Sequence, residues 1–371
     1  MTIHSTLFMR AARGLPVSRT PVWFMRQAGR VLPEYRAVRG VLSLLEICRR
    51  PDVCAEVTLQ PVRRFGVDAA ILFADIMHPL IGAGVSLDIT DGVGPVIHNP
   101  VSTMTDVKAL RQLEPIADLP YVLEAIGLVK ADLGDTTPLI GFSGAPFTLA
   151  AYLIEGRSSR DFARTKAMMF GAPDVWHALM DRLTDIVVAY LAAQRGAGVD
   201  ALQLFDSWVG CLSPSDYQQF VQPYTRRIFG KLQALGAPLI HFGVNTATLL
   251  GEMRHDGADV IGVDWRIPLD DAWAVIGGGT SIQGNLDPAA LLGSPDLIVR
   301  KVNGVLHRAG HRNGHIFNLG HGLLPQTPLE SVELVVDTVH RYASAHAATG
   351  HGQQGPEAER ELVASGGRTA W

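Results

Sequence analysis

Eight short apolar segments, each of strand length, constrain the fold of this chain more than any other feature of its sequence. Most of them are apolar at nearly every position rather than at alternate positions. This pattern is typical of strands that are buried on both faces, as in a parallel sheet covered by helices. The eight segments are 22–25, 70–76, 139–143, 201–206, 239–242, 260–264, 281–285 and 315–319.

Segments with a helical period separate these apolar runs. Within 173–195, five apolar residues recur at four-residue steps, namely Val175, Leu179, Leu183, Val187 and Leu191. Such spacing places them on one face of a helix. Further helices are predicted at 51–65, 213–235, 246–255, 270–276, 288–308 and 327–347. Strands that alternate with helices eight times predict an α/β fold, a single (β/α)₈ barrel of the TIM type, rather than an open doubly wound sheet.

We expect one catalytic barrel domain over residues 1–347. The stretch 80–136, after the second strand, is longer than one crossover needs. Its glycines and a proline between residues 82 and 95 predict a hairpin-like insertion, followed by a helix at 121–133. Residues 348–371 are mostly polar or small, with Gly, Gln, Glu and Ser among them, and hold few core residues, which predicts a disordered tail.

Composition excludes several classes of protein. The chain has 371 residues and a net charge of −4, so no overall basic field favours nucleic acid or an anionic membrane as a partner. The cysteines Cys48, Cys54 and Cys211 form no CxxC pair, which predicts neither a disulfide scaffold nor a cysteine-rich metal site. Neither a signal peptide nor a membrane span is evident, and we expect a cytoplasmic protein.

A loop rich in arginine follows the first apolar run. Arg26, Gln27, Ala28, Gly29 and Arg30 come directly after the segment 22–25, and a third arginine, Arg36, follows in the same stretch. Arginine binds carboxylates and phosphates through paired hydrogen bonds, and glycine allows backbone to approach a ligand closely. The loop therefore predicts an anion-binding site at the end of a buried strand, although a solvated basic loop would have the same composition.

Polar residues also follow the later strands, at the end of a barrel where active sites lie. Asp75, Ser207 and His321 are the most informative of them, and His321 stands between two glycines. Plainer alternatives exist for three residues: Asp75 could cap a helix or pair in an internal salt bridge, Ser207 could satisfy backbone donors, and Tyr152 could be a core aromatic. His321 is less easily structural, because its two glycines suggest a close approach to something. His241 lies within a strand, where a buried neutral histidine is the favoured interpretation.

Five blocks of the chain carry a family resemblance. They are RQAGR at 26–30 with LPEYR at 32–36, LFADI at 72–76, GFSGAPFTLAAY at 141–152, QLFDSW at 203–208 and NLGHG at 318–322. Together they resemble the signatures of the uroporphyrinogen decarboxylase family. The resemblance extends in order from about residue 7 to residue 345, and Val31 departs from it where the family often has an aromatic residue.

The resemblance implies an activity and a set of residues. It implies a carboxy-lyase that removes the four acetate carboxylates of uroporphyrinogen III to give coproporphyrinogen III in haem biosynthesis. It also implies a TIM-type barrel, no metal or organic cofactor, and a homodimer. By the same resemblance Asp75, Arg26 and Arg30 are catalytic. The implied substrate-binding residues are Arg26, Gln27, Ala28, Gly29, Arg30, Asp75, Tyr152, Ser207 and His321.

Two other functions fit a chain of this kind. A zinc-dependent methyltransferase of the same scaffold, acting on corrinoid or thiol substrates, needs a His-x-Cys pair and a further cysteine as ligands. Here His241 is followed by Phe242 and Gly243, and no cysteine follows Cys211. A non-catalytic tetrapyrrole-binding protein would keep the arginines but would not need Asp75.

Overall fold

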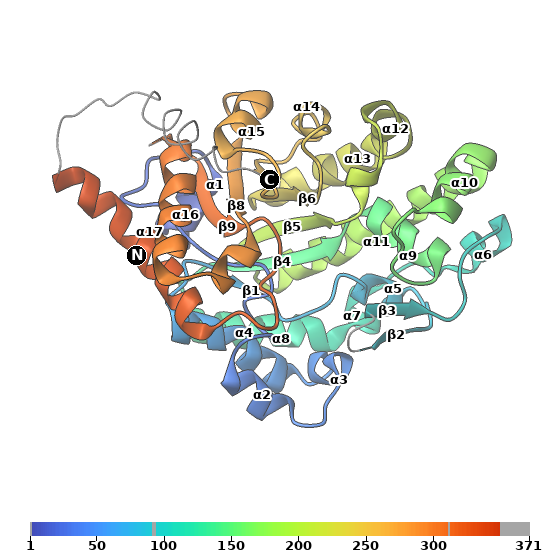
Figure 1. The fold of residues 1–371 in the computed structure, drawn as a ribbon. Helices are drawn as coiled ribbons and strands as arrows, with labels where there is room; N and C mark the ends of the chain where they lie inside the picture. Colours follow the sequence, from blue (N-terminus) through green and yellow to red (C-terminus); the bar gives the residue numbers. More distant parts are fainter. Residues whose placement is uncertain (1, 91–93, 311, 349–371) are drawn as a thin grey trace, which may run out of the picture.

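The computed structural model describes residues 2–90, 94–310 and 312–348, and its centre is a seven-stranded parallel sheet (Figure 1). Each strand pairs with the next one along the chain, in the order β1-β4-β5-β6-β7-β8-β9. The strands are β1 Ala70–Ile71, β4 Leu139–Gly144, β5 Ala201–Asp206, β6 Leu239–Gly243, β7 Val260–Gly262, β8 Ser281–Leu286 and β9 His315–Leu319. This sequential parallel order confirms the predicted α/β fold class.

The segment predicted as the first strand, 22–25, is not a regular strand. It forms a single parallel bridge, between Val22 and Phe317 in β9. The Trp23 amide donates to the Phe317 carbonyl at 3.3 Å, and the Asp68 amide, just before β1, donates to the Val22 carbonyl at 2.8 Å. The segment therefore lies between the two edge strands at the eighth position of the barrel. Regular pairing cannot continue beyond it, because Arg26 has a φ of 58° and turns the chain out of the sheet.

A ring of helices encloses the sheet. Around it, α4, α8, α11, α13, α12, α14, α15, α16 and α17 contact one another in that order, and α17 contacts α4. The helices are α1 Leu7–Ala12, α2 Pro33–Arg39, α3 Leu44–Cys48, α4 Pro51–Phe65, α5 His78–Gly82, α6 Met104–Ala109, α7 Pro115–Asp118, α8 Pro120–Leu133, α9 Pro146–Glu155, α10 Ala163–Gly171, α11 Pro173–Ala197, α12 Pro214–Phe220, α13 Gln222–Leu232, α14 Leu250–Met253, α15 Leu269–Ile276, α16 Pro295–Ala309 and α17 Leu329–Ala348. The short helices α2 and α3 lie beside α4, outside the ring (Figure 1).

Prolines and glycines explain where the predicted helices are interrupted. The helix predicted at 213–235 begins with Ser213, whose side chain accepts from the Asp216 amide, but it divides into α12 and α13. Pro223 stands in the first turn of α13, where it has no amide hydrogen to continue α12. The helix predicted at 288–308 likewise divides at Gly293, into a 3₁₀ turn at Pro288–Leu292 and α16.

The insertion after β1 contains the predicted hairpin and helix. Strands β2 (Leu87–Thr90) and β3 (Gly94–Ile97) pair in antiparallel fashion, and the predicted helix is α8. Residues 91–93, which include Gly92 of the predicted hairpin, lie outside the described residues. The Ile97 amide donates to the Gly156 carbonyl at 2.7 Å and so attaches the hairpin to the end of α9.

The domain limits stay a prediction. Residue 348 is the last of α17, and the rest of the predicted tail, 349–371, lies outside the described residues. Among the helices that the structure describes, none combines the length and the apolar composition that a membrane crossing requires.

Candidate active site

A cavity of about 760 Å³ opens where the chain leaves the C-terminal ends of the barrel strands. Segments that follow 22–25, β1, β5 and β9 line it, together with α9. Eight of the nine predicted substrate-binding residues lie on its wall: Arg26, Ala28, Gly29, Arg30, Asp75, Tyr152, Ser207 and His321. Residues that are distant in the sequence therefore converge on one space, as expected for a site built from several barrel loops.

Gln27 is the predicted residue that does not line the cavity. Its side chain is fully buried. Its Oε1 accepts from the Phe24 amide at 3.0 Å, and its Nε2 donates to the Ala69 carbonyl at 3.1 Å. The amide thus fastens the arginine loop to the chain just before β1. A contact between Gln27 and substrate stays a prediction.

A glycine allows the arginine loop to lie close to the barrel. Gly29 has a φ of 83°, and a Cβ at this position would overlap the ring of Phe73. A larger residue would have to push either the loop or the Phe73 ring away from the cavity. The predicted close approach at Gly29 is therefore an approach to the protein's own wall.

Positive charge dominates the cavity. Arg26, Arg30, Arg36 and Arg39 line it, and Asp75 is the one carboxylate among the residues on its wall. Within the described part of the chain, the guanidinium groups of Arg26, Arg30 and Arg36 make no hydrogen bond or ion pair with the protein, whereas Arg39 donates to the Leu42 carbonyl at 3.2 Å. Such groups are available to an anionic ligand.

Arg36 belongs to the predicted arginine-rich stretch but was not named as a site residue, and Arg39 was missed in the sequence. Both belong to α2 and stand three residues apart, a spacing that places two side chains on the same face of a helix. That spacing, directly after the arginine loop, was the signal that could have found them.

Asp75 is fixed by a turn that leaves one of its oxygens free. The predicted strand 70–76 ends at Ile71, because the Phe73 backbone leaves the sheet: its amide donates to Thr58 Oγ1 at 2.9 Å, and its carbonyl accepts from Cys54 Sγ at 3.0 Å. Residues beyond β1 thereby turn to the cavity wall. Asp75 Oδ1 accepts from the Met77 amide at 2.9 Å, and among the described residues Oδ2 has no hydrogen-bond donor.

Tyr152 and His321 are neutral at pH 7. Burial, and next the negative charge of Asp75, raises the pKa of Tyr152 to about 12, so that its phenol is a hydrogen-bond donor. Burial, and next the positive charge of Arg26, lowers the pKa of His321 to about 4. His321 therefore presents an uncharged imidazole to the cavity, and the arginines alone supply its positive charge.

The glycines beside His321 allow close packing within the protein. A Cβ at Gly320 would lie 2.5 Å from the Trp265 amide nitrogen, and a Cβ at Gly322 would lie 2.5 Å from Cδ of Arg26. The predicted close approach is present, but its partner is protein. It places His321 between the end of β7 and the arginine loop.

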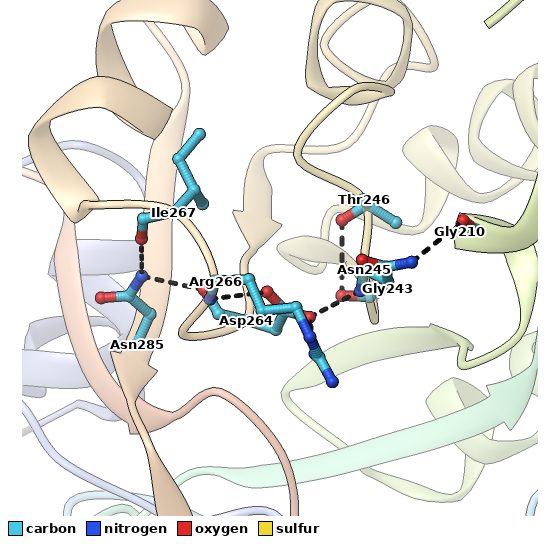
Figure 2. Close-up of polar contacts among 8 residues, drawn as sticks. All are labelled: Gly210, Gly243, Asn245, Thr246, Asp264, Arg266, Ile267 and Asn285. Atoms are coloured by element: carbon cyan, nitrogen blue, oxygen red, sulfur yellow. Dashed lines mark hydrogen bonds and ion pairs between the residues drawn. The ribbon is translucent and has the colours of Figure 1, made fainter. Parts of the chain in front are cut away.

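The ends of β6, β7 and β8 carry polar residues of a different kind. Figure 2 shows Asp264 between Asn285 on one side and Asn245 on the other. Its carboxylate accepts from the amides of Asn245, at 2.6 Å, and Arg266, at 3.0 Å, and it forms an ion pair with the Arg266 guanidinium. Asn285 Nδ2 donates to the carbonyls of Asp264 and Ile267 at 2.9 and 2.7 Å. We call these five residues the Asp264 network.

His241 is buried as predicted, but its predicted neutral state is wrong. Burial by itself would lower the pKa of His241, yet the neighbouring carboxylates of Asp206 and Asp256 raise it to about 9. The ring is therefore charged at pH 7. A sequence pattern cannot supply this information, because Asp206 lies in another strand and Asp256 lies in the loop between α14 and β7.

Comparison with solved structures supports the fold. A methyltransferase from Methanosarcina mazei is similar with a TM-score of 0.77 at 21% sequence identity, over 91% of this chain and 99% of that chain. A B12-independent methionine synthase from Shewanella sp. W3-18-1 is similar with a TM-score of 0.54 at 11% identity, over 85% of this chain and 89% of that chain.

Comparison of sequences identifies the family. The uroporphyrinogen decarboxylase family model matches residues 4–342. A uroporphyrinogen decarboxylase of Thermus thermophilus is 53% identical over 344 residues, which cover 93% of this chain and all of the relative. That of Streptomyces coelicolor is 53% identical over 337 residues, or 91% of this chain and 94% of the relative. The chain therefore belongs to the uroporphyrinogen decarboxylase family.

Proposed function

We propose that this protein removes the four acetate carboxylates of uroporphyrinogen III and releases coproporphyrinogen III. The observation that carries the proposal is a cavity with four arginines and one carboxylate on its wall, in a chain whose net charge is −4. The substrate is a flexible tetrapyrrole with eight carboxylates and four pyrrole N–H groups. Local arginines are needed to bind the carboxylates, and a carboxylate is needed to accept from the pyrroles.

Asp75 has the position for the second of these tasks. Its Oδ1 is engaged by the Met77 amide, and Oδ2 is left to accept from pyrrole N–H groups. Because the turn fixes the carboxylate before substrate arrives, little reorganisation is needed when charge develops on the ring. We assign Asp75 as the group that stabilises the cationic ring in the transition state.

The substrate supplies its own electron sink. Protonation of the pyrrole α-carbon next to the carbon that bears the acetate group makes the ring cationic. The bond to the carboxylate then breaks, carbon dioxide leaves, and its electron pair flows into the ring. A proton added to the exocyclic carbon completes the methyl group, and loss of the first proton restores the pyrrole. No external oxidant, metal or organic cofactor is needed for this balance of electrons.

The remaining residues bind and orient carboxylates. Arg26 and Arg30 have guanidinium groups without protein partners among the described residues, so they can pair with substrate carboxylates. We propose that one of them also directs the proton to the ring, a demanding role because a guanidinium is a weak acid at neutral pH. Tyr152 and His321 contribute neutral hydrogen bonds, Ser207 contributes a hydroxyl, and the backbone of Ala28 and Gly29 borders the bound carboxylates.

The two rival functions lack a supporting observation. Zinc-dependent methyl transfer needs a His-x-Cys pair, but Phe242 and Gly243 follow His241. His241 is also enclosed between Asp206 and Asp256. A binding protein without catalysis would not need the exposed oxygen of Asp75, which is why Asp75 separates the carrier from the enzyme.

Two further properties follow from family membership and belong to the proposal. We expect a homodimer, which light scattering coupled to size-exclusion chromatography would detect as twice the 40.0 kDa chain mass. We also expect a cytoplasmic location, which cell fractionation would test.

The deciding experiment is anaerobic incubation of chelator-treated protein with uroporphyrinogen III, followed by chromatography that separates products by carboxylate number. Stepwise formation of seven-, six-, five- and four-carboxylate porphyrinogens is expected. No conversion by the wild-type chain would contradict the proposal, and activity that returned only with zinc or a corrinoid would favour methyl transfer. Tight binding without conversion would favour a carrier.

A further inference from the structure

A buried histidine between two buried aspartates lies next to the cavity but does not line it. His241, in β6, has no exposed surface, and Asp206 and Asp256 are also buried. His241 Nε2 lies 3.8 Å from Asp206 Oδ2, and Nδ1 lies 3.4 Å from Asp256 Oδ2. Among the described residues, no lysine or arginine pairs with either aspartate. The imidazolium is therefore the one cation among the described residues that pairs with these carboxylates.

At one end of the group formed by His241, Asp206 and Asp256, Asp256 is attached to two helices. The Tyr217 hydroxyl in α12 donates to Asp256 Oδ2, and Gln222 Nε2 in α13 donates to Asp256 Oδ1 at 3.0 Å. Gln222 Nε2 also donates to the Glu252 carbonyl at 2.9 Å. Asp256 is thus held by hydrogen bonds from side chains of α12 and α13.

At the other end of the group, Asp206 is connected to the cavity wall. Asp206 is the last residue of β5, and its Oδ1 accepts from Thr148 Oγ1 at 2.8 Å. Thr148 Oγ1 in turn accepts from the Trp208 amide at 3.2 Å. Ser207, between Asp206 and Trp208 in the chain, lines the cavity. The two bonds fix the backbone on both sides of Ser207.

Tyr152 is connected to Thr148 and to Trp208, the two residues joined by the second of these hydrogen bonds. Tyr152 lies four residues after Thr148 in α9, and so on the same face of that helix. Its ring also packs against the ring of Trp208, with centroids 5.8 Å apart and an angle of 63° between the planes. Any shift of Asp206 is therefore transmitted to two side chains of the cavity wall, Ser207 and Tyr152.

We propose that His241 is a positioning residue for substrate binding, which holds Asp206 and through it fixes the places of Ser207 and Tyr152. The inference rests on the proposed function in one respect, that these two side chains bind the tetrapyrrole. The raised pKa of His241, about 9, agrees with a ring that stays charged between the carboxylates. A ring that merely filled space would need no carboxylate on either side.

His315 offers a matched control for burial alone. It is another buried strand histidine, in β9, with 3% of its surface exposed. Its Nε2 lies 2.9 Å from the Gly284 carbonyl oxygen, and burial lowers its pKa to about 4. No carboxylate pairs with it among the described residues, and it does not line the cavity. Replacing it tests the loss of a buried imidazole without the loss of the proposed link.

The test compares His241→Phe, Thr148→Val, the double variant and His315→Phe. The dissociation constant for uroporphyrin, the oxidised planar analogue of the substrate, is measured by fluorescence titration, and KM and kcat are measured with uroporphyrinogen III. His241→Phe, which removes an ion pair, and Thr148→Val, which removes a hydrogen bond, should each raise the dissociation constant and KM about three- to tenfold, the range for one weakened polar interaction. The double variant should be no worse than the weaker-binding single variant, because both changes act through Asp206. His315→Phe should stay within about twofold of wild type, since His315 makes no polar contact with His241, Asp206 or Thr148.

Each other outcome has a defined meaning. Unchanged binding in His241→Phe would overturn the proposal, and so would a double variant whose effect is the product of the single effects. If His241→Phe does not fold, unchanged binding in Thr148→Val would overturn it. A wild-type chain that binds uroporphyrin but does not decarboxylate uroporphyrinogen would refute the proposed function, and the binding series would still decide on His241. A wild-type chain that does not bind uroporphyrin would overturn both.

Discussion

The cavity and the Asp264 network lie on the same end of one barrel, yet their charged groups are arranged in opposite ways. In the cavity, the guanidinium groups of Arg26, Arg30 and Arg36 have no protein partner among the described residues. In the Asp264 network, the one carboxylate is matched by two amides and the Arg266 guanidinium (Figure 2).

This difference separates a site from a structural feature. A polar group with its partners in place has little left to offer a ligand, whereas unpaired cations around one carboxylate gain most when an anion arrives. Polar residues after barrel strands are thus insufficient to define a site, since both regions have them. The state of their hydrogen bonds makes the distinction, and each prediction below compares one region with the other.

The largest difference is expected between Asp75→Asn and Asp264→Asn. Asp75→Asn should lower kcat roughly 100-fold or more, because stabilisation of developing charge by a fixed group is worth about 3 kcal/mol. Uroporphyrin binding should fall far less, since the arginines remain. Asp264→Asn should leave kcat within about threefold of wild type. Steady-state kinetics on both variants measure this, and unchanged turnover in Asp75→Asn would refute its assigned role.

The next largest difference is expected between the effects on KM of replacing an arginine of the cavity and an arginine of the Asp264 network. Arg30→Gln removes a cation that lines the cavity, and KM should rise about 10- to 100-fold, the equivalent of one charge-assisted hydrogen bond of about 1.5–3 kcal/mol. Arg266→Gln removes a cation that already has a carboxylate partner and should change KM less than about threefold. Equal effects of the two substitutions on KM would mean that the unpaired state of the arginines does not identify the site.

The free energy of unfolding should respond in the reverse order, more to a change in the Asp264 network than to a change in the cavity. Asp264→Asn leaves the Arg266 guanidinium without its carboxylate and weakens two hydrogen bonds from backbone amides. A loss of about 1–3 kcal/mol in the free energy of unfolding is expected. Arg30→Gln, which breaks no bond within the described part of the protein, should change it by less than about 0.5 kcal/mol. Urea unfolding monitored by circular dichroism gives both values. A larger loss in Arg30→Gln would contradict the comparison.

Much of the fold could be predicted because its signals are local. The strands at 201–206 and 315–319 and the helix at 51–65 have the bounds that the apolar pattern and the flanking Pro and Gly predict. The prediction of a regular strand at 22–25 was wrong, and of the strand predicted at 70–76 only Ala70–Ile71 is regular. Bonds from distant residues decide their paths, such as that of the Phe73 amide to Thr58, and no pattern within either segment contains them.

The site divides in the same manner. Its arginine loop and Asp75 were identified from their places after strands and from family blocks. Three features appear only in the folded structure. Arg26 and Arg30 have no protein partner among the described residues, a turn fixes Asp75, and the Gln27 amide is used to attach the loop. The protonation states of buried groups were the property least accessible from the sequence. The charge of His241 depends on Asp206 and Asp256, which lie 35 residues before and 15 residues after it in the sequence.

The smallest effect concerns His321, where the cavity uses a neutral group beside its arginines. Its pKa of about 4 means that the free enzyme carries an uncharged imidazole from pH 5.5 to pH 8.5, and protonates it only well below that range. His321→Asn should therefore lower kcat/KM by one constant factor, about three- to tenfold, at every pH in that range. The ratio of wild type to variant cancels the ionisation of the substrate, which both proteins share. If the ratio instead changes as the pH passes the ordinary histidine value of ~6.5, His321 titrates in the free enzyme, and the arginines do not supply the positive charge of the cavity alone.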